Sequence, residues 1–157
     1  MSALNSAPVT IRFFMPGERL RPYISTFYAT NVEPAGDDRI VDWLHPEWAN
    51  LRFIRGTLPI GAIGQNEKLA APAFCVVGPT SYATYFESQS MRSWGVGLLP
   101  LGWSKFIGLS AEEYADQTLD GAELSATKKF LPLRDMLLGN DGANLEEEAK
   151  QIEYFFD

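Results

Sequence analysis

The chain has 157 residues, of which 46% are hydrophobic and 13% aromatic, so it can form one domain with a substantial core and is not a disordered chain. Its net charge is −7, and the largest basic cluster is Lys128-Lys129, which argues against nucleic-acid binding by this chain alone. Cys75 is the only cysteine, so no internal disulfide can form and a reducing, cytoplasmic setting is expected. The first ten residues lack a secretion signal, and no segment has the ~18 apolar residues of a membrane span, so no membrane partner is expected.

Aromatic and β-branched residues, broken by turn residues, predict a series of short strands between Pro22 and Pro100. The predicted strands are 23–32, 39–44, 50–56, 58–67, 73–78, 82–87 and 91–99. The last two are joined by the polar turn "SQS", which predicts a β-hairpin. Because no helices separate these strands, the pattern favours an antiparallel barrel or sandwich.

The strand 91–99 is unusual because one of its faces carries almost no side chains. Trp94, Val96 and Leu98 share one face, whereas Ser93, Gly95 and Gly97 share the other. A bare face allows close approach, either by a neighbouring strand or helix or by the flat surface of a ligand.

The segment after this strand reads as a junction between strands and helices. Pro100 cannot donate a ladder hydrogen bond and ends the strand, after which 103–107 forms a short helical turn. Gly108 suits the left-handed cap that follows such a turn. Ser110 and Glu113 have capping-box spacing and predict the start of another helix.

The C-terminal third is predicted to be helical. The segment 132–140 begins with a proline that a first helical turn tolerates and has Gly139 near its end. A last helix starts near Asn144, with three glutamates in its first turn that favour the helix dipole. The overall prediction is an α+β fold with a β unit over 1–125 and a helical segment over 126–157, which dimerises or links to a further domain.

The last helix carries one apolar stripe, which packs either on the domain's own barrel or on a second copy of the chain. The candidate dimerisation residues are therefore Leu145, Ala149, Ile152 and Phe156. The aromatic end "EYFFD" is explained either by docking of this helix or by a natural polypeptide that continues beyond Asp157.

A search for catalytic chemistry yields one weak candidate. His45 lies near Asp42 and Glu47, but metal-binding barrels of the cupin type use several histidines, and a single one before a proline is typical of a surface residue. No serine lies in a nucleophile turn, and Cys75 lies in the apolar run "AFCVVG", which suits an inert thiol. We therefore expect no catalytic residue, no metal and no cofactor, and we predict that the chain is not an enzyme.

The strands are rich in aromatic residues, which either fill the core or line a pocket for a small molecule. Arg52 and Arg55 can supply charge for an anionic ligand, or else face water. The aromatic residues considered are Tyr28, Trp43, Trp48, Phe53, Tyr82, Tyr85, Phe86 and Trp94. The candidate ligand-binding residues are Tyr28, Trp43, Phe53, Arg55, Tyr85 and Trp94.

Three segments in order carry a resemblance to a known family. They are "LRPYISTFY" (20–28), "VVGPTSYATYFES" (76–88) and "WGVGLLPLGWSKFIGLSAEEYADQ" (94–117). Over about residues 20–125 the chain resembles the N-terminal sensor domain of AraC-type transcriptional regulators. It differs from many relatives in one segment, which reads "GVGLLPLGW" here instead of a more polar "V-x-F-x-P-x-G" pattern.

The resemblance implies a cupin-like barrel, a helical dimerisation segment and a C-terminal pair of helix-turn-helix units that bind DNA, the last of which is absent from this chain. The predicted function is therefore that of a ligand-sensing and dimerisation domain of such a regulator. Its partners would be an unidentified small-molecule effector, a second copy of the chain, and DNA only through the missing domain. The alternative is a free-standing cupin-like enzyme, either an isomerase or a metal-dependent dioxygenase.

Overall fold

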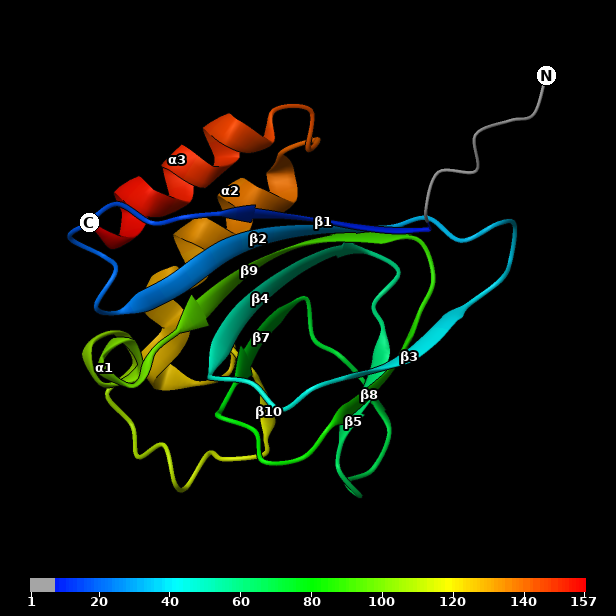
Figure 1. Cartoon of the computed structure of the whole chain (residues 1–157), viewed down its shortest axis with the longest axis horizontal. Helices are drawn as coiled ribbons and strands as arrows, with labels where there is room; N and C mark the ends of the chain where they lie inside the picture. The colour runs from blue at the N-terminus through cyan, green and yellow to red at the C-terminus, as the bar shows by residue number, and fades with distance from the viewer. Residues whose placement is uncertain (1–7) are drawn as a thin grey trace.

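The computed structural model describes residues 8–157 and contains two antiparallel sheets with helices packed on one of them (Figure 1). The predicted absence of a secretion signal, and the start of the predicted unit 1–125, concern residues 1–7, which lie outside the described residues. The larger sheet has, in spatial order, the strands β1 (Val9–Phe14), β2 (Ile24–Val32), β9 (Met91–Leu98), β4 (Asn50–Gly56), β7 (Phe74–Val77) and β10 (Thr118–Asp120). The smaller sheet has the strands β3 (Ile40–Leu44), β8 (Thr84–Ser88), β5 (Ile60–Ile63) and β6 (Leu69–Ala70).

The predicted α+β class and antiparallel pairing are confirmed, but the predicted closed barrel is wrong. In the described part of the chain, β1 and β10 end the larger sheet, and β3 and β6 end the smaller one. Within residues 8–157 no ladder of hydrogen bonds joins the two sheets, so both remain open and face each other as in the sandwich alternative.

The predicted hairpin between 82–87 and 91–99 is also wrong. β8 pairs with β3 and β5 in the smaller sheet, whereas β9 pairs with β2 and β4 in the larger one. The short turn after Ser88 therefore carries the chain from one sheet to the other. Ser88 itself is only 1% exposed at this crossing, where its hydroxyl donates to the carbonyl of Gln89 at 3.1 Å.

The strand β4 at the centre of the larger sheet contributes to both of its faces. Leu51 and Phe53 are buried in the main core, which the sheet shares with the helices. Asn50 and Ile54 are buried on the opposite face, toward the smaller sheet. The strands β7 and β9 alternate in the same way, because successive side chains of a strand point to opposite faces.

A series of aromatic contacts joins this sheet to the helices. Phe53 on β4 stacks on Phe74 of β7, with ring centroids 4.7 Å apart. Phe74 meets Phe130 edge-on at 6.5 Å, and Phe130 lies 5.6 Å from Phe156 near the C-terminus. Such pairs add about 0.5–1.5 kcal/mol each beyond the burial of their area, so the sheet and the helices form one core.

The junction after β9 is partly as predicted. Pro100 begins the short helix α1 (Pro100–Gly102), which continues as the π-helical turn η1 (Trp103–Ile107) and ends at Gly108, whose φ is +72°. The predicted helix from Ser110 is wrong, because 111–116 forms a run of turns, although the expected hydrogen bond from Glu113 N to Ser110 Oγ is present at 3.4 Å. A continued helix is blocked at Asp116, whose φ of +57° is left-handed.

The C-terminal third is helical as predicted. It consists of the 3-10 helix η2 (Ser125–Phe130) and the helices α2 (Leu131–Gly139) and α3 (Leu145–Phe156). Asn144 caps α3, because its side chain accepts a hydrogen bond from Glu147 N at 3.1 Å.

The apolar stripe of α3 packs on the chain's own core, which is the first of the two alternatives considered for it. Ile152 is fully buried, and Ala149 and Phe156 are 7% and 6% exposed, while the partly buried Leu145 packs against the same cluster. These four residues therefore do not offer a free surface to a second copy of the chain, and any self-association would use another surface.

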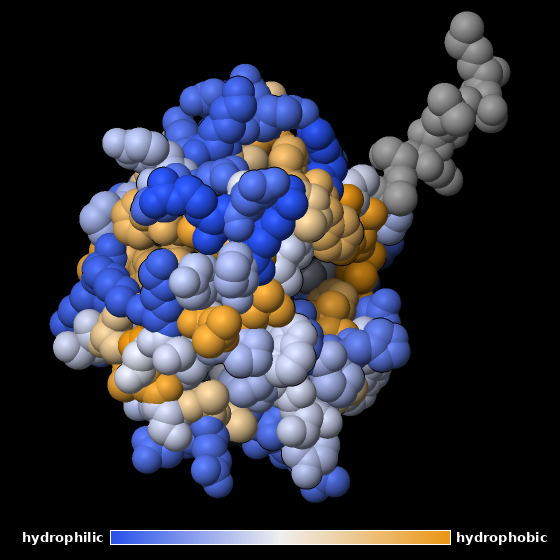
Figure 2. Space-filling model, turned by 60° about the vertical axis from the view of Figure 1, so that its left-hand side comes forward, coloured by the Kyte–Doolittle hydropathy of each residue, from blue (hydrophilic) through white to orange (hydrophobic). Residues whose placement is uncertain are grey.

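The outer face of the helices is hydrophilic. Figure 2 shows mainly blue residues at the top of the molecule, where Figure 1 places α2, α3 and the turn between them. Glu146, Glu147 and Lys150 on α3 are exposed there. Among residues 8–157, no helix combines the length and the hydrophobicity that crossing a bilayer requires.

The burial of the α3 stripe predicts a large effect on stability. Ile152→Ala should lower the free energy of unfolding by about 2–5 kcal/mol, because it removes a fully buried side chain and leaves a cavity. Tyr154→Ala is the matched control, since Tyr154 is 87% exposed on the same helix and its loss should change stability by less than about 0.5 kcal/mol. Urea unfolding followed by circular dichroism measures both variants. Equal small effects, or a folded Ile152→Ala protein that merely changes its association state, would contradict this packing.

Candidate functional site

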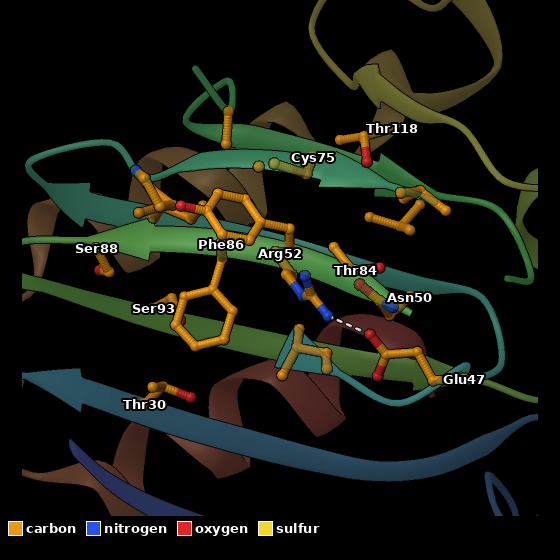
Figure 3. Close-up of a pocket in the computed structure, with 18 of the residues that line it drawn as sticks. Thr30, Glu47, Asn50, Arg52, Cys75, Thr84, Phe86, Ser88, Ser93 and Thr118 are labelled. Atoms are coloured by element: carbon orange, nitrogen blue, oxygen red, sulfur yellow. Dashed lines mark hydrogen bonds and ion pairs between the residues drawn. The ribbon is translucent and has the colours of Figure 1, made fainter. Parts of the chain in front are cut away.

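A cavity of about 640 Å³ lies between the two sheets (Figure 3). The larger sheet lines it with the side of β2, β4, β7 and β9 that faces away from the helices, and the smaller sheet lines it with β5 and β8. Its volume is within the range of about 300–1,000 Å³ that small-molecule sites occupy. Most of its lining is apolar, but about a third of the lining residues are polar, among them Asn50, Arg52 and Glu47.

Arg52 is the central polar residue of the cavity. Its guanidinium forms an ion pair with Glu47 (Figure 3), and its Nε donates a hydrogen bond to the hydroxyl of Tyr28 at 3.3 Å. Only 22% of the Arg52 side chain is exposed. Burial opposes the charge of Arg52, but Tyr28 and Glu47 outweigh this effect and raise its pKa above the ordinary value, so the group stays cationic.

Glu47 is held in place by a second segment of chain. Its backbone N–H donates to Thr80 Oγ1 at 2.8 Å, and the backbone N–H of Thr80 donates to the carbonyl of Glu47 at 3.0 Å. Asp116 fixes this second segment, because its carboxylate accepts from Ser81 N at 2.6 Å and its own N–H donates to the carbonyl of Pro79 at 3.0 Å. The ion pair with Arg52 therefore has a carboxylate that the surrounding loops position in advance.

Side chains of the neighbouring strand β2 cover the bare face of β9. Close approach by a neighbouring strand was one of the two alternatives that the sequence left open. A Cβ atom at Gly95 would lie 1.9 Å from the ring of Tyr28, and one at Gly97 would lie 2.3 Å from Ser25 Oγ. Glycine at position 95 lets the Tyr28 ring lie flat on the sheet, where its hydroxyl reaches Arg52. Gly97 also lines the cavity beside Asn50, its partner on β4.

Asn50 and Ser88 are the two polar side chains of the cavity wall that are almost fully buried. Asn50 is 1% exposed, and its Nδ2 donates to the carbonyl of Trp48 at 3.4 Å. Its Oδ1 is buried and accepts no hydrogen bond from any residue in 8–157. An unpaired buried acceptor costs about 1–3 kcal/mol, so this atom is a favourable partner for a donor inside the cavity.

Cys75 also borders the cavity and is 2% exposed. Its Sγ lies 3.1 Å from the carbonyl of Pro72, to which the thiol donates. Burial raises the pKa of Cys75 to about 12, and the nearby Arg52 only partly opposes this shift. At neutral pH the group is therefore a neutral thiol.

The structure does not bring the six predicted ligand-binding residues together. Tyr28 and Tyr85 line the cavity between the sheets. Trp43 packs edge-on against Tyr85 at 5.1 Å but is 57% exposed. Phe53 and Trp94 are buried on the other face of the larger sheet. Of the other aromatic residues considered, Trp48 and Phe86 line the cavity.

Arg55, the sixth candidate, lies in a second cavity of about 530 Å³, between the larger sheet and the helices. Arg55 and Arg92 both donate to the carbonyl of Asn140, the latter at 3.4 Å, and so hold the turn between α2 and α3. Glu148 borders the same space and is 5% exposed, and its buried Oε2 has no hydrogen-bond partner in the described part of the chain. These charged groups lie around the turn that connects α2 and α3. The second cavity therefore differs from the first, which lies between the two sheets.

The residues considered for a metal site do not gather around His45. Glu47 pairs with Arg52, and Asp42 Oδ1 accepts from the backbone N–H of Trp43 at 2.8 Å. Within residues 8–157, no group of three or more His, Cys, Asp or Glu side chains is arranged to hold a metal ion.

Sequence reasoning did not name Asn50, considered Glu47 only for a metal site with His45, and named Arg52 only as a possible source of charge. One signal was present, because Asn50 and Arg52 alternate with the strongly apolar Leu51 and Phe53 in a central strand. If the apolar set faces the helices, the polar set must face the interior on the other side. No such signal exists for Glu47, which reaches Arg52 from a loop.

Comparison with known proteins adds no assignment. No model of a known protein family matches the chain, and a search of curated proteins finds no significant match.

The protonation of Cys75 predicts a slow and pH-dependent reaction with thiol reagents. In the native protein, iodoacetamide should react with Cys75 at least about a hundredfold more slowly at pH 9 than after unfolding in urea, because only the thiolate reacts and Cys75 is 2% exposed. The folded state favours the neutral thiol, so its contribution to stability is complete below pH 9 and is lost as the pH rises toward 12. Mass spectrometry of the single adduct gives the rates. Comparable rates in the native and unfolded states would contradict this arrangement.

Proposed function

We propose that this chain is a ligand-sensing domain that binds a small, mainly apolar molecule between its two sheets. The observation that carries the proposal is the division of the larger sheet into two buried faces, one lining a cavity of about 640 Å³ and the other packed against the helices. A small molecule in this cavity would contact the same strands on which the helices rest. The proposal includes the role of such a domain in an AraC-type transcriptional regulator, to which the sequence bears a resemblance.

Transmission to the helices would be a shift between two arrangements rather than a chemical step. Ile54 on β4 borders the cavity, and the preceding residue, Phe53, begins the aromatic series that ends at Phe156 on α3. A ligand that binds one arrangement of β4 more tightly would therefore change the packing of α3. By linkage, whatever the helices engage would in turn change the affinity for the ligand.

The DNA-binding part of the proposed regulator would lie outside this chain. The net charge of −7 supports a division of labour in which this domain senses and another domain contacts phosphate. The outer face of α3 carries exposed acidic residues and would remain available to a neighbouring domain, because its apolar stripe is already buried.

Sensing through the cavity predicts that occupancy alters the helices. Butylbenzene, used as a simple apolar probe, should bind saturably and change the hydrogen-exchange rates of amides in α2 and α3 by several-fold. Ser93→Trp should abolish binding, because position 93 borders the cavity, as Figure 3 shows. Ser104→Trp, at an exposed position of η1, is the matched control and should bind as the unmodified chain does.

Calorimetry measures the binding, and hydrogen–deuterium exchange mass spectrometry measures the response of the helices. Binding that leaves α2 and α3 unchanged would overturn the sensing mechanism while keeping the cavity as a ligand site. The absence of any binding would count against the cavity itself.

The regulator part of the proposal makes a separate prediction about the gene. The reading frame that encodes this chain should continue past the codon for Asp157 into a basic segment with two helix-turn-helix patterns. The mass of the endogenous protein should exceed that of this chain accordingly. A stop codon directly after Asp157, with a matching endogenous mass, would remove the regulator from the proposal and leave the ligand-binding domain.

A further inference from the structure

The chemistry of the ligand can be inferred from the polar side chains at one end of the cavity. Asn50, Arg52 and Glu47 lie together where β4 begins, as Figure 3 shows. Ile54, Ile63, Val77 and Met91 form an apolar cluster that also borders the cavity. A bound molecule would therefore meet a polar wall and an apolar wall in the same space.

The polar end offers a buried acceptor that has no partner in the described chain. Asn50 borders the cavity, and its Oδ1 is buried and unpaired within the described chain, so a donor reaches this atom only when the amide turns toward the cavity. A ligand group that donates an O–H or N–H to this atom would remove the cost of its desolvation. A purely apolar ligand offers no donor, so the cost of the unpaired oxygen would remain.

The polar end also offers donors. A guanidinium has five N–H groups. In the described chain, the Arg52 guanidinium uses Nε toward Tyr28 and Nη2 toward Glu47, and Nη1 has no protein acceptor. A ligand oxygen can therefore accept from Arg52 without displacing either partner.

The charge of this end is already balanced. Arg52 and Glu47 form an ion pair, so the pair presents no net charge to the cavity. A ligand carboxylate near Arg52 would also lie near Glu47, and a ligand ammonium near Glu47 would also lie near Arg52. In a partly buried site, an uncompensated charge costs more than a neutral hydrogen-bonding group of similar size.

We propose that the cavity selects an uncharged ligand with an apolar body and a single polar head, such as a primary amide or a hydroxyl. The head donates to Asn50 Oδ1 and accepts from Arg52, and the apolar body lies along the cluster that contains Ile54 and Met91. This inference rests on the proposed function, because it assigns chemistry to the same cavity. It also replaces the anionic ligand that the arginines alone suggested.

Four compounds with the same butylphenyl group test the inference, namely 4-butylbenzamide, 4-butylbenzoate, 4-butylbenzylammonium and butylbenzene. Calorimetry on the whole chain at neutral pH should give the amide an affinity about tenfold or more above each of the other three. Such a ratio is the size expected when one buried, unpaired acceptor gains a donor.

Two variants link this ranking to the named residues. Glu47→Gln removes the carboxylate that balances Arg52 and should raise the affinity for butylbenzoate about tenfold, so that it equals or exceeds the amide. Glu67→Gln is the matched control, since Glu67 also borders the cavity but forms no ion pair with Arg52, and it should keep the ranking. Asn50→Leu should reduce the advantage of the amide over butylbenzene.

Each outcome separates the two proposals. Tightest binding of the carboxylate or the ammonium, or a ranking that Glu47→Gln leaves unchanged, would overturn the neutral ligand and keep the cavity as a binding site. Equal affinity for the amide and butylbenzene would overturn the role of the polar head. Failure of all four compounds to bind would overturn the proposed function as well. If Asn50→Leu does not fold, the comparison between Glu47→Gln and Glu67→Gln decides the question.

Discussion

The larger sheet must bury both of its faces, and the two faces have different chemistry. On β4, Leu51 and Phe53 belong to the aromatic and aliphatic core under the helices, whereas Arg52 between them points into the space between the sheets. A cation in this position is tolerated only with a partner, and Glu47 supplies it. The loop that carries Glu47 is in turn fixed by Thr80. The ion pair therefore links β4 to the loop that carries Glu47, and it sets the charge that a bound molecule would meet.

The same division explains why the helices and the larger sheet form one unit rather than two separate bodies. Phe130 of η2 and Phe156 of α3 complete the core that Phe53 and Phe74 begin, so removal of the helices would expose the sheet's apolar face. The boundary expected between 125 and 126 coincides with the start of η2 at Ser125, but the segments on either side share one hydrophobic cluster. A change in strand packing can reach the helices through this shared core because closely packed interiors transmit strain.

Local sequence patterns located the elements better than their partners. The predicted strand over 50–56 matches β4, and the predicted start of the last helix at Asn144 matches its cap. The predicted hairpin was wrong because a polar turn between two strands shows that the chain reverses, not that both strands join the same sheet. The strand β10 escaped prediction because its three residues form too short a pattern. The α3 stripe was recognised as a contact surface, but amphipathicity alone does not name the surface that covers it.

The candidate site was harder to predict, because aromatic content measures how much volume must be filled and not which way each ring points. Phe53 and Trp94 serve the core, while Tyr28 serves the cavity, and all three belong to strands of one sheet. Arginine is similarly ambiguous, since Arg52 and Arg55 are three residues apart on β4 and lie in different cavities. The charge that a ligand meets is decided by Glu47, which a loop brings to Arg52. An arginine in a strand therefore indicates an anionic ligand only when no carboxylate from another part of the fold already neutralises it.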